Sequence, residues 1–239
     1  GDTGTNMSMT INAAAGDLRK LEDPSLEQAG KAAASAMLRG ARGNSGVILS
    51  LLFRGIAKKL KGAEDCDGVL WAAALQEGVD AAYKAVMKPA EGTVLTVSRL
   101  AAKRAVEAAA ENNDPEFVLS EALREGYDAL AQTTDMNPVL KKAGVVDAGG
   151  KGYLLILEGM LRALRGEGVE HLMLSWTLGG YPCNNIATAA KYFYENARVD
   201  FRHRHVDRLA PAEEAIALSD GSAHKGGHGI AQGMIAQLI

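Results

Sequence analysis

The chain has 239 residues, of which 47% are hydrophobic and 5% aromatic, and its formal net charge is −3. This length allows one large domain or two small ones, and the frequent alanines favour closely packed helices over a β-sandwich. The balanced charge excludes the global basic field that marks many nucleic-acid-binding proteins. We expect neither a signal peptide nor a stable membrane insertion, because no apolar run is long enough to cross a bilayer.

The two cysteines, Cys66 and Cys183, lie far apart in the sequence. They form neither a paired metal-binding spacing nor a disulfide framework. This usage favours a reducing compartment, so we expect a cytoplasmic protein.

Helical periodicity dominates the first two-thirds of the chain, and no convincing alternating strand pattern interrupts it. Short connections between the helices favour antiparallel packing. Asp114-Pro115 and Asn137-Pro138 are strong helix starts, the second opening a short helical turn. The predicted helices span about residues 5–21, 25–39, 47–61, 69–87, 94–111, 115–132 and 153–165.

The opening stretch, Gly1 to Met7, is glycine-rich and polar and precedes an alanine-rich helix. Asp2 is a hard oxygen ligand of the kind that suits the Mg²⁺ accompanying nucleotide phosphates. Thr3, Thr5 and Asn6 can cap the helix, whose free N–H groups then favour a bound phosphate. Taken alone, however, such a stretch is more often a turn followed by an N-cap.

Three further loops have a similar character, and with the first they could gather at one end of a bundle. No Walker-type motif and no strand-linked glycine motif is present, so a nucleotide site would have to be built from these loops. Their sequences are Gly40-Ala41-Arg42-Gly43-Asn44-Ser45-Gly46, Lys88-Pro89-Ala90-Glu91-Gly92-Thr93 and Gly144-Val145-Val146-Asp147-Ala148-Gly149-Gly150-Lys151-Gly152.

In order and spacing, the four motifs resemble the nucleotide-binding domain of bacterial fatty-acid kinases, which is related to the L-type, ATP-binding subunit of dihydroxyacetone kinases. The resemblance covers about residues 1–165. It implies an all-α, antiparallel barrel or bundle of about eight amphipathic helices with the nucleotide at one end. We accordingly assign residues 1–168 to a nucleotide-binding helical domain and leave residues 169–239 as an unassigned tail.

The resemblance also implies the cofactors ATP and Mg²⁺ and a set of site residues. Asp2 matches the last aspartate of the family's Asp-Gly-Asp-Thr-Gly and is the expected metal ligand and catalytic residue. The family's other metal-binding aspartates would precede Gly1, so we expect residues upstream. One carboxylate alone holds Mg²⁺ weakly unless substrate phosphates complete its shell.

The remaining site residues carry over by motif. Thr3, Gly4, Thr5 and Asn6 would line the phosphates, and Asn44, Ser45 and Gly46 would hold phosphate or nucleotide. Gly92 and Thr93 would approach the base or ribose, and Asp147, Ala148 and Gly149 would close the site. Ser45 and Thr93 could instead be plain caps, Asp147 a turn residue, and Arg42 a surface residue rather than a phosphate ligand.

The implied chemistry is transfer of the γ-phosphoryl group of ATP, for which positioning and charge neutralisation are the main requirements. In fatty-acid kinases the acceptor is a fatty acid carried by a separate DegV-like fatty-acid-binding protein, which is the expected partner. A homodimer is left open. The alternatives are a dihydroxyacetone-type sugar kinase domain and a non-catalytic nucleotide-binding module.

The tail beyond about Val169 has no counterpart in the resemblance. A helix over about residues 186–196 would supply the eighth helix, and a short one would follow over about 230–239. His203, His205, His224 and His228 could form a metal site, but no acidic or cysteine partner has matching spacing. A basic surface is the simpler interpretation.

Overall fold

A computed structural model describes residues 3–166, 177–178 and 181–182 of the chain. These residues form the helices α1 (Thr3–Leu18), α2 (Leu26–Gly40), α3 (Gly43–Lys59), α4 (Gly68–Ala85), α5 (Val94–Glu111), α6 (Pro115–Met136), α7 (Pro138–Ala143) and α8 (Ala148–Leu164). Two short strands, β1 (Thr177–Leu178) and β2 (Tyr181–Pro182), pair antiparallel. The described part of the chain is thus all-α in class, as predicted.

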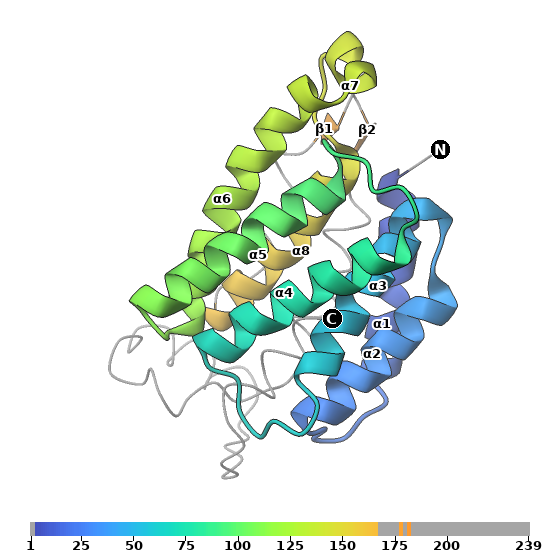
Figure 1. The fold of residues 1–239 in the computed structure, drawn as a ribbon. Helices are drawn as coiled ribbons and strands as arrows, with labels where there is room; N and C mark the ends of the chain where they lie inside the picture. Colours follow the sequence, from blue (N-terminus) through green and yellow to red (C-terminus); the bar gives the residue numbers. More distant parts are fainter. Residues whose placement is uncertain (1–2, 167–176, 179–180, 183–239) are drawn as a thin grey trace.

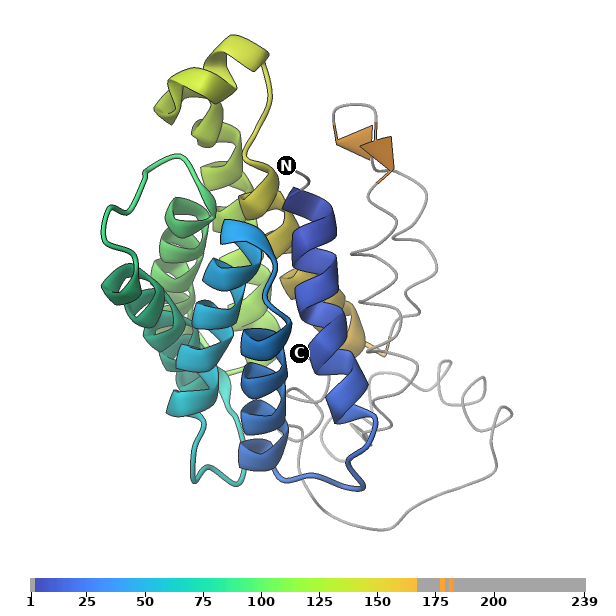
Figure 2. The same cartoon turned by 90° about the vertical axis from the view of Figure 1, so that its right-hand side faces the viewer.

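The long helices run up and down and surround a common core (Figures 1 and 2). Each of α1 to α6 packs against the next along the chain, and α8 packs against α5, α6 and α1. The contact between α8 and α1 closes the ring, so the helices form a barrel. The first turns of α1, α3, α5 and α8 consequently lie at one end of the barrel, the loop end, which is the upper end in Figure 1.

The helix starts follow from local sequence chemistry. Ser25 and Gln28 form a reciprocal capping box at α2. Asp67 caps α4 by accepting from the backbone N–H of Leu70. Asp114 caps α6, whose first position is the predicted Pro115. These short polar signals fix where the up-and-down helices begin.

Small residues allow the helices to approach closely, as the frequent alanines predicted. Ala29, Ala33 and Ala105 are fully buried in the core. At the contact between α3 and α4, a Cβ atom on Gly78 would lie 2.6 Å from the carbonyl oxygen of Leu52, and one on Gly55 would overlap the backbone of α4. Only glycine fits where two backbones meet this closely.

Two helices begin earlier than the sequence predicted. α3 begins at Gly43 rather than Val47, and α8 begins at Ala148 rather than Tyr153. The glycine-rich stretches before them were predicted as loops because glycine disfavours helices. In the fold, tertiary packing outweighs that local cost. Smaller corrections are that α1 spans Thr3–Leu18, α4 ends at Ala85, and α6 continues to Met136.

Several predictions fall on residues outside the described part of the chain. These are the role of Asp2, the helices at about 186–196 and 230–239, and the four-histidine interpretation. Among the described residues, Cys66 is buried, and burial raises the pKa of its thiol, which keeps it protonated. None of the described helices combines the length and apolar character needed to cross a bilayer.

A candidate nucleotide site at the loop end of the barrel

The first and second motifs meet where α1 and α3 begin. A Cβ atom on Gly43 would overlap the side-chain amide of Asn6, and one on Gly46 would overlap the hydroxyl of Thr10. Gly43 also has a positive φ of 57°, which glycine adopts without strain. The first two motifs therefore lie together at one end, and they do so through close contact between the two helix starts.

The residues of the first motif lie inside α1 rather than in a loop. Thr3, Gly4, Thr5 and Asn6 form its first turn and are half-buried. They lie inside the helix, whereas Thr3, Thr5 and Asn6 had been expected to cap its start. The N–H groups of a first helical turn have no partner within the helix and point out of its end.

The second motif forms the start of α3. Arg42 is the N-cap residue, and its side chain makes no capping hydrogen bond. Asn44 is exposed, Ser45 half-buried and Gly46 buried, all within the first turns. Ser45 is thus not a cap. Because no acidic residue lies in the first turn of α3 either, the positive end of its dipole is left for a bound anion.

The third motif is folded tightly at the start of α5. Gly92 is buried with a φ of 73°, and its Cβ would lie 2.9 Å from the Cβ of Met136. Thr93 is the N-cap, accepting from the N–H of Leu95 and donating to the carbonyl of Ala90. The plain capping role considered for Thr93 is therefore present in the structure.

Polar side chains of α4 and α5 form a cluster with Glu91 of the third motif. The carboxylate of Glu91 accepts hydrogen bonds from the hydroxyl of Thr96 and the guanidinium of Arg99, each at 2.8 Å. Chiefly the Thr96 hydrogen bond, and then Arg99, lowers the pKa of Glu91. Tyr83 joins the cluster by accepting from Arg99. These hydrogen bonds attach the third loop to α4 and α5.

The fourth motif is organised by Asp147, the N-cap of α8. Its carboxylate accepts from the N–H of Gly150 at 2.6 Å and is also hydrogen-bonded by the N–H groups of Val94 and Gly149. Burial raises the pKa of Asp147, and these backbone hydrogen bonds oppose the rise. Ala148 and Gly149 lie in the first turn of α8. One carboxylate thus links the starts of α5 and α8.

Among the described side chains, the two halves of this end differ in charge. The α5 and α8 half already contains an anion, the carboxylate of Asp147, at its helix starts. The α3 start has no such group among the described side chains. A phosphate would be favoured at the α1 and α3 half and repelled by Asp147 at the other. Arg42 is exposed, and its guanidinium donates to the carbonyl of Ala41.

Sequence reasoning missed three residues just inside this end. Thr10 and Thr133 are fully buried, and their hydroxyls bond across to the second and fourth motifs. Lys151 is buried in the first turns of α8, with its ammonium 4.4 Å from the centre of the Tyr127 ring. Burial lowers the pKa of Lys151 to about 8. A polar residue at a core position of a predicted helix is the signal that could have found Thr10, whereas Thr133 and Lys151 lie outside the predicted helices.

The described residues bear differently on the two expected cofactors, ATP and Mg²⁺. Uncapped N–H groups at the start of α3 suit nucleotide phosphates. No group of three or more histidine, cysteine or acidic side chains suited to a metal lies within the described ranges. Asp2, the expected Mg²⁺ ligand, lies outside them. The start of α3 therefore suits the phosphates, whereas the described residues supply no metal-binding cluster of their own.

The class of the protein is a helical barrel. Its glycine-bearing helix starts converge at one end. The family comparison agrees: the DAK2 domain matches residues 1–162. The chain belongs to this family, the domain type of the L subunit of dihydroxyacetone kinases. Its membership makes it a kinase-related, nucleotide-binding type of domain.

Curated relatives match over a similar length of the chain. Protein YloV of Bacillus subtilis is 46% identical over 169 residues, which is 71% of this chain and 31% of that protein. An uncharacterized protein of Staphylococcus haemolyticus is 46% identical over 170 residues, and one of Staphylococcus aureus 45% over 170. For both, the match covers 71% of this chain and 31% of the relative. The match thus spans about a third of these relatives.

Proposed function

We propose that this chain is the ATP- and Mg²⁺-binding domain of a kinase that transfers the γ-phosphoryl group of ATP to a fatty acid carried by a separate DegV-like fatty-acid-binding protein. The observation that carries the proposal is the contact between the first two motifs, which places the uncapped start of α3 beside the start of α1. The resemblance of all four motifs to fatty-acid kinases supports the acceptor.

Each motif has a distinct part in this proposal. The first turns of α1 and α3 donate N–H groups to the phosphates, and Asp2 binds Mg²⁺. Gly92 brings the backbone close to the base or ribose, while Thr93 and Asp147 act through the turns they hold, because their side chains are already hydrogen-bonded. Bound with ATP, Mg²⁺ neutralises the charge on the transferring group.

The first experiment is calorimetric titration of the 239-residue chain with ATP, with and without Mg²⁺. We expect Mg²⁺-dependent binding that Asp2→Ala abolishes. The matched control is Asp17→Asn, which removes a carboxylate from the other end of α1, where it pairs with Lys20 and Arg39. Absence of ATP binding by the unmodified chain would contradict the proposal.

The second experiment separates the acceptors. The chain is incubated with ATP and a fatty-acid-loaded DegV-like protein, and acyl phosphate is trapped with hydroxylamine as the hydroxamate. Dihydroxyacetone is offered in parallel, because membership of the DAK2 family favours a dihydroxyacetone-type kinase as the second candidate. Hydroxamate formation supports the fatty-acid acceptor, and sugar phosphate formation the alternative. ATP binding without either product would identify a non-catalytic module.

A further inference from the structure

Thr10 lies in α1, one turn inside the first motif, and is fully buried. Its hydroxyl donates to the carbonyl of Asn6 at 2.7 Å and accepts from the backbone N–H of Arg42 at 3.2 Å. Arg42 is the N-cap residue of α3. A single hydroxyl therefore joins the first turn of α1 to the residue at which α3 begins.

The same hydroxyl also fixes how closely the two helices approach. Gly46 sits directly against Thr10, so that any Cβ at position 46 would overlap the hydroxyl oxygen. Gly43 packs in the same way against Asn6, the residue whose carbonyl receives the hydrogen bond of Thr10. The hydrogen bond and the two glycines thus act on one contact, between the starts of α1 and α3.

From this geometry we propose that Thr10 is a positioning residue for nucleotide binding, whose hydroxyl sets the start of α3 against the first turn of α1. It does not touch the ligand. Its effect reaches the phosphates through Arg42, because the N–H groups that follow Arg42 take their direction from it. The inference rests on the proposed function, since it concerns the same phosphate-binding end.

A second buried threonine uses the same device in the other half of the site. The hydroxyl of Thr133 donates to the carbonyl of Leu130 at 2.6 Å and accepts from the N–H of Asp147 at 3.0 Å. Asp147 is the N-cap residue of α8, as Arg42 is of α3. In both halves, a buried hydroxyl on one helix holds the N-cap residue of another. The repetition argues that the hydroxyls serve the placement of helix starts rather than local helix stability.

The test compares two substitutions at Thr10. Thr10→Val keeps the shape but leaves the N–H of Arg42 without its partner and puts a methyl group against Gly46. Thr10→Ser keeps the hydroxyl and loses only the methyl group. The matched control is Ser50→Ala in α3, because Ser50 is also fully buried but donates only within its own helix, to the carbonyl of Val47.

The affinity for Mg²⁺-ATP is measured by calorimetry at a temperature at which circular dichroism finds every variant folded. We expect Thr10→Val to lose about tenfold in affinity, the equivalent of one lost hydrogen bond, while Thr10→Ser and Ser50→Ala stay within about twofold. Amide hydrogen exchange at Arg42 should accelerate in Thr10→Val and not in Thr10→Ser.

Three outcomes would overturn the inference, and they are distinguishable. If the unmodified chain binds ATP and Thr10→Val binds it equally well, Thr10 is structural and the proposed function stands. If Thr10→Ser loses as much affinity as Thr10→Val, the hydroxyl does not determine ATP affinity. The inference then fails, and the proposed function stands. If the unmodified chain binds no ATP, the proposed function fails and the inference with it.

Discussion

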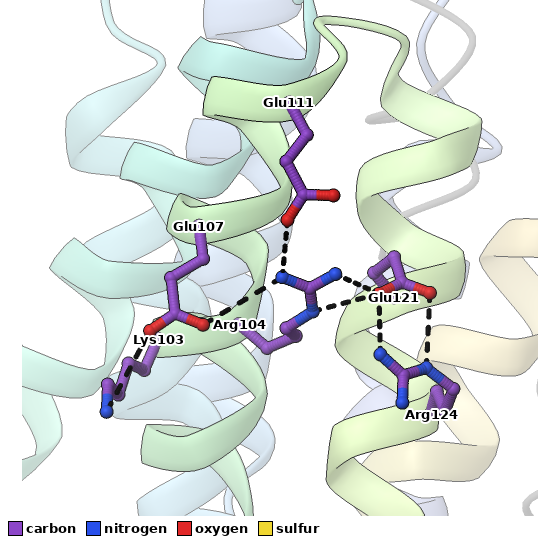
Figure 3. Close-up of polar contacts among 6 residues, drawn as sticks. All are labelled: Lys103, Arg104, Glu107, Glu111, Glu121 and Arg124. Carbon is purple, nitrogen blue, oxygen red and sulfur yellow. Dashed lines mark hydrogen bonds and ion pairs between the residues drawn. The ribbon is translucent and has the colours of Figure 1, made fainter.

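The loop end of the barrel and the outer face of α5 and α6 use polar groups in opposite ways. On the α5 and α6 face, charged side chains pair with one another (Figure 3). Arg104 contacts Glu111 and Glu121, and Arg124 binds Glu121 from the other side. At the loop end, apart from the pair of Glu91 and Arg99, the contacts are made by backbone N–H groups, hydroxyls and the carboxylate of Asp147.

The difference indicates which region is available to a ligand. In the cluster of Figure 3, the charged side chains neutralise one another. The side chains of Arg104 and Glu121 are only 18% and 19% exposed. Such a cluster contributes to stability but offers little to a charged ligand. The α3 start has directed N–H groups and no carboxylate among the described side chains. Density of charge is therefore a poor guide to the site in this protein.

The largest expected effect is that of Gly46→Ala. The new methyl group would overlap the hydroxyl of Thr10, so α3 must shift away from α1. We expect a loss of about 1–3 kcal/mol in the free energy of unfolding and at least a tenfold loss of ATP affinity. The control is Gly16→Ala in α1, where nothing lies within 4 Å of the new Cβ. Equal ATP affinity in the two variants would contradict a nucleotide site at the loop end.

Asp147→Ala should have the next largest effect. It removes the side chain that accepts from the N–H of Gly150, so the cap of α8 is lost. The expected cost is about 1 kcal/mol in the free energy of unfolding. Asp147→Asn keeps an accepting oxygen and should cost less. Urea denaturation of both variants checks this order, and an alanine variant as stable as the unmodified chain would contradict it.

Glu121→Gln tests the other region and should cost about 1 kcal/mol at pH 7. Arg124 and then Arg104 lower the pKa of Glu121 from 4.5 to about 2. A lowered acid pKa stabilises the fold above the unfolded value of 4.5, and this contribution is lost as the pH falls from 4.5 towards 2. The difference between the two proteins should therefore shrink in urea titrations over that range.

The same substitution should leave ATP affinity unchanged, because the cluster lies away from the helix starts. A loss of affinity in Glu121→Gln would break the distinction between the two regions. High salt should also reduce the stability difference, since partly exposed ion pairs are screened.

Lys103→Gln should have the smallest effect. Lys103 is 71% exposed and lies 3.8 Å from Glu107 at the rim of the cluster. We expect a change within about 0.5 kcal/mol in the free energy of unfolding and none in ATP binding. Thermal unfolding beside Glu121→Gln provides the comparison, and a cost as large as that of Glu121→Gln would mean that the rim, not the centre, holds the cluster together.

The sequence by itself determined the helical class and most helix positions. α5 has the predicted bounds, Val94–Glu111, and α6 begins at the predicted Pro115. Both follow from signals within a few residues of the boundary: Thr93 as a cap, and Asp114 before a proline. The motif order also led to the wider family of the dihydroxyacetone kinase L subunit, which the DAK2 match confirms, whereas the fatty-acid kinase branch stays a prediction. The roles of the individual site residues stay predictions.

Only the tertiary structure decided where α3 and α8 begin and what joins them to their neighbours. Glycine-rich segments predict loops on local grounds, yet Gly46 and Gly150 lie in helices. There, Thr10 and Val97 leave no room for a larger side chain. Thr10 and Arg42 are far apart in the sequence, so no local pattern connects the hydroxyl of one with the N–H of the other. Local chemistry sets which segments are helical, whereas contacts between helices set how the ends of those helices form a site.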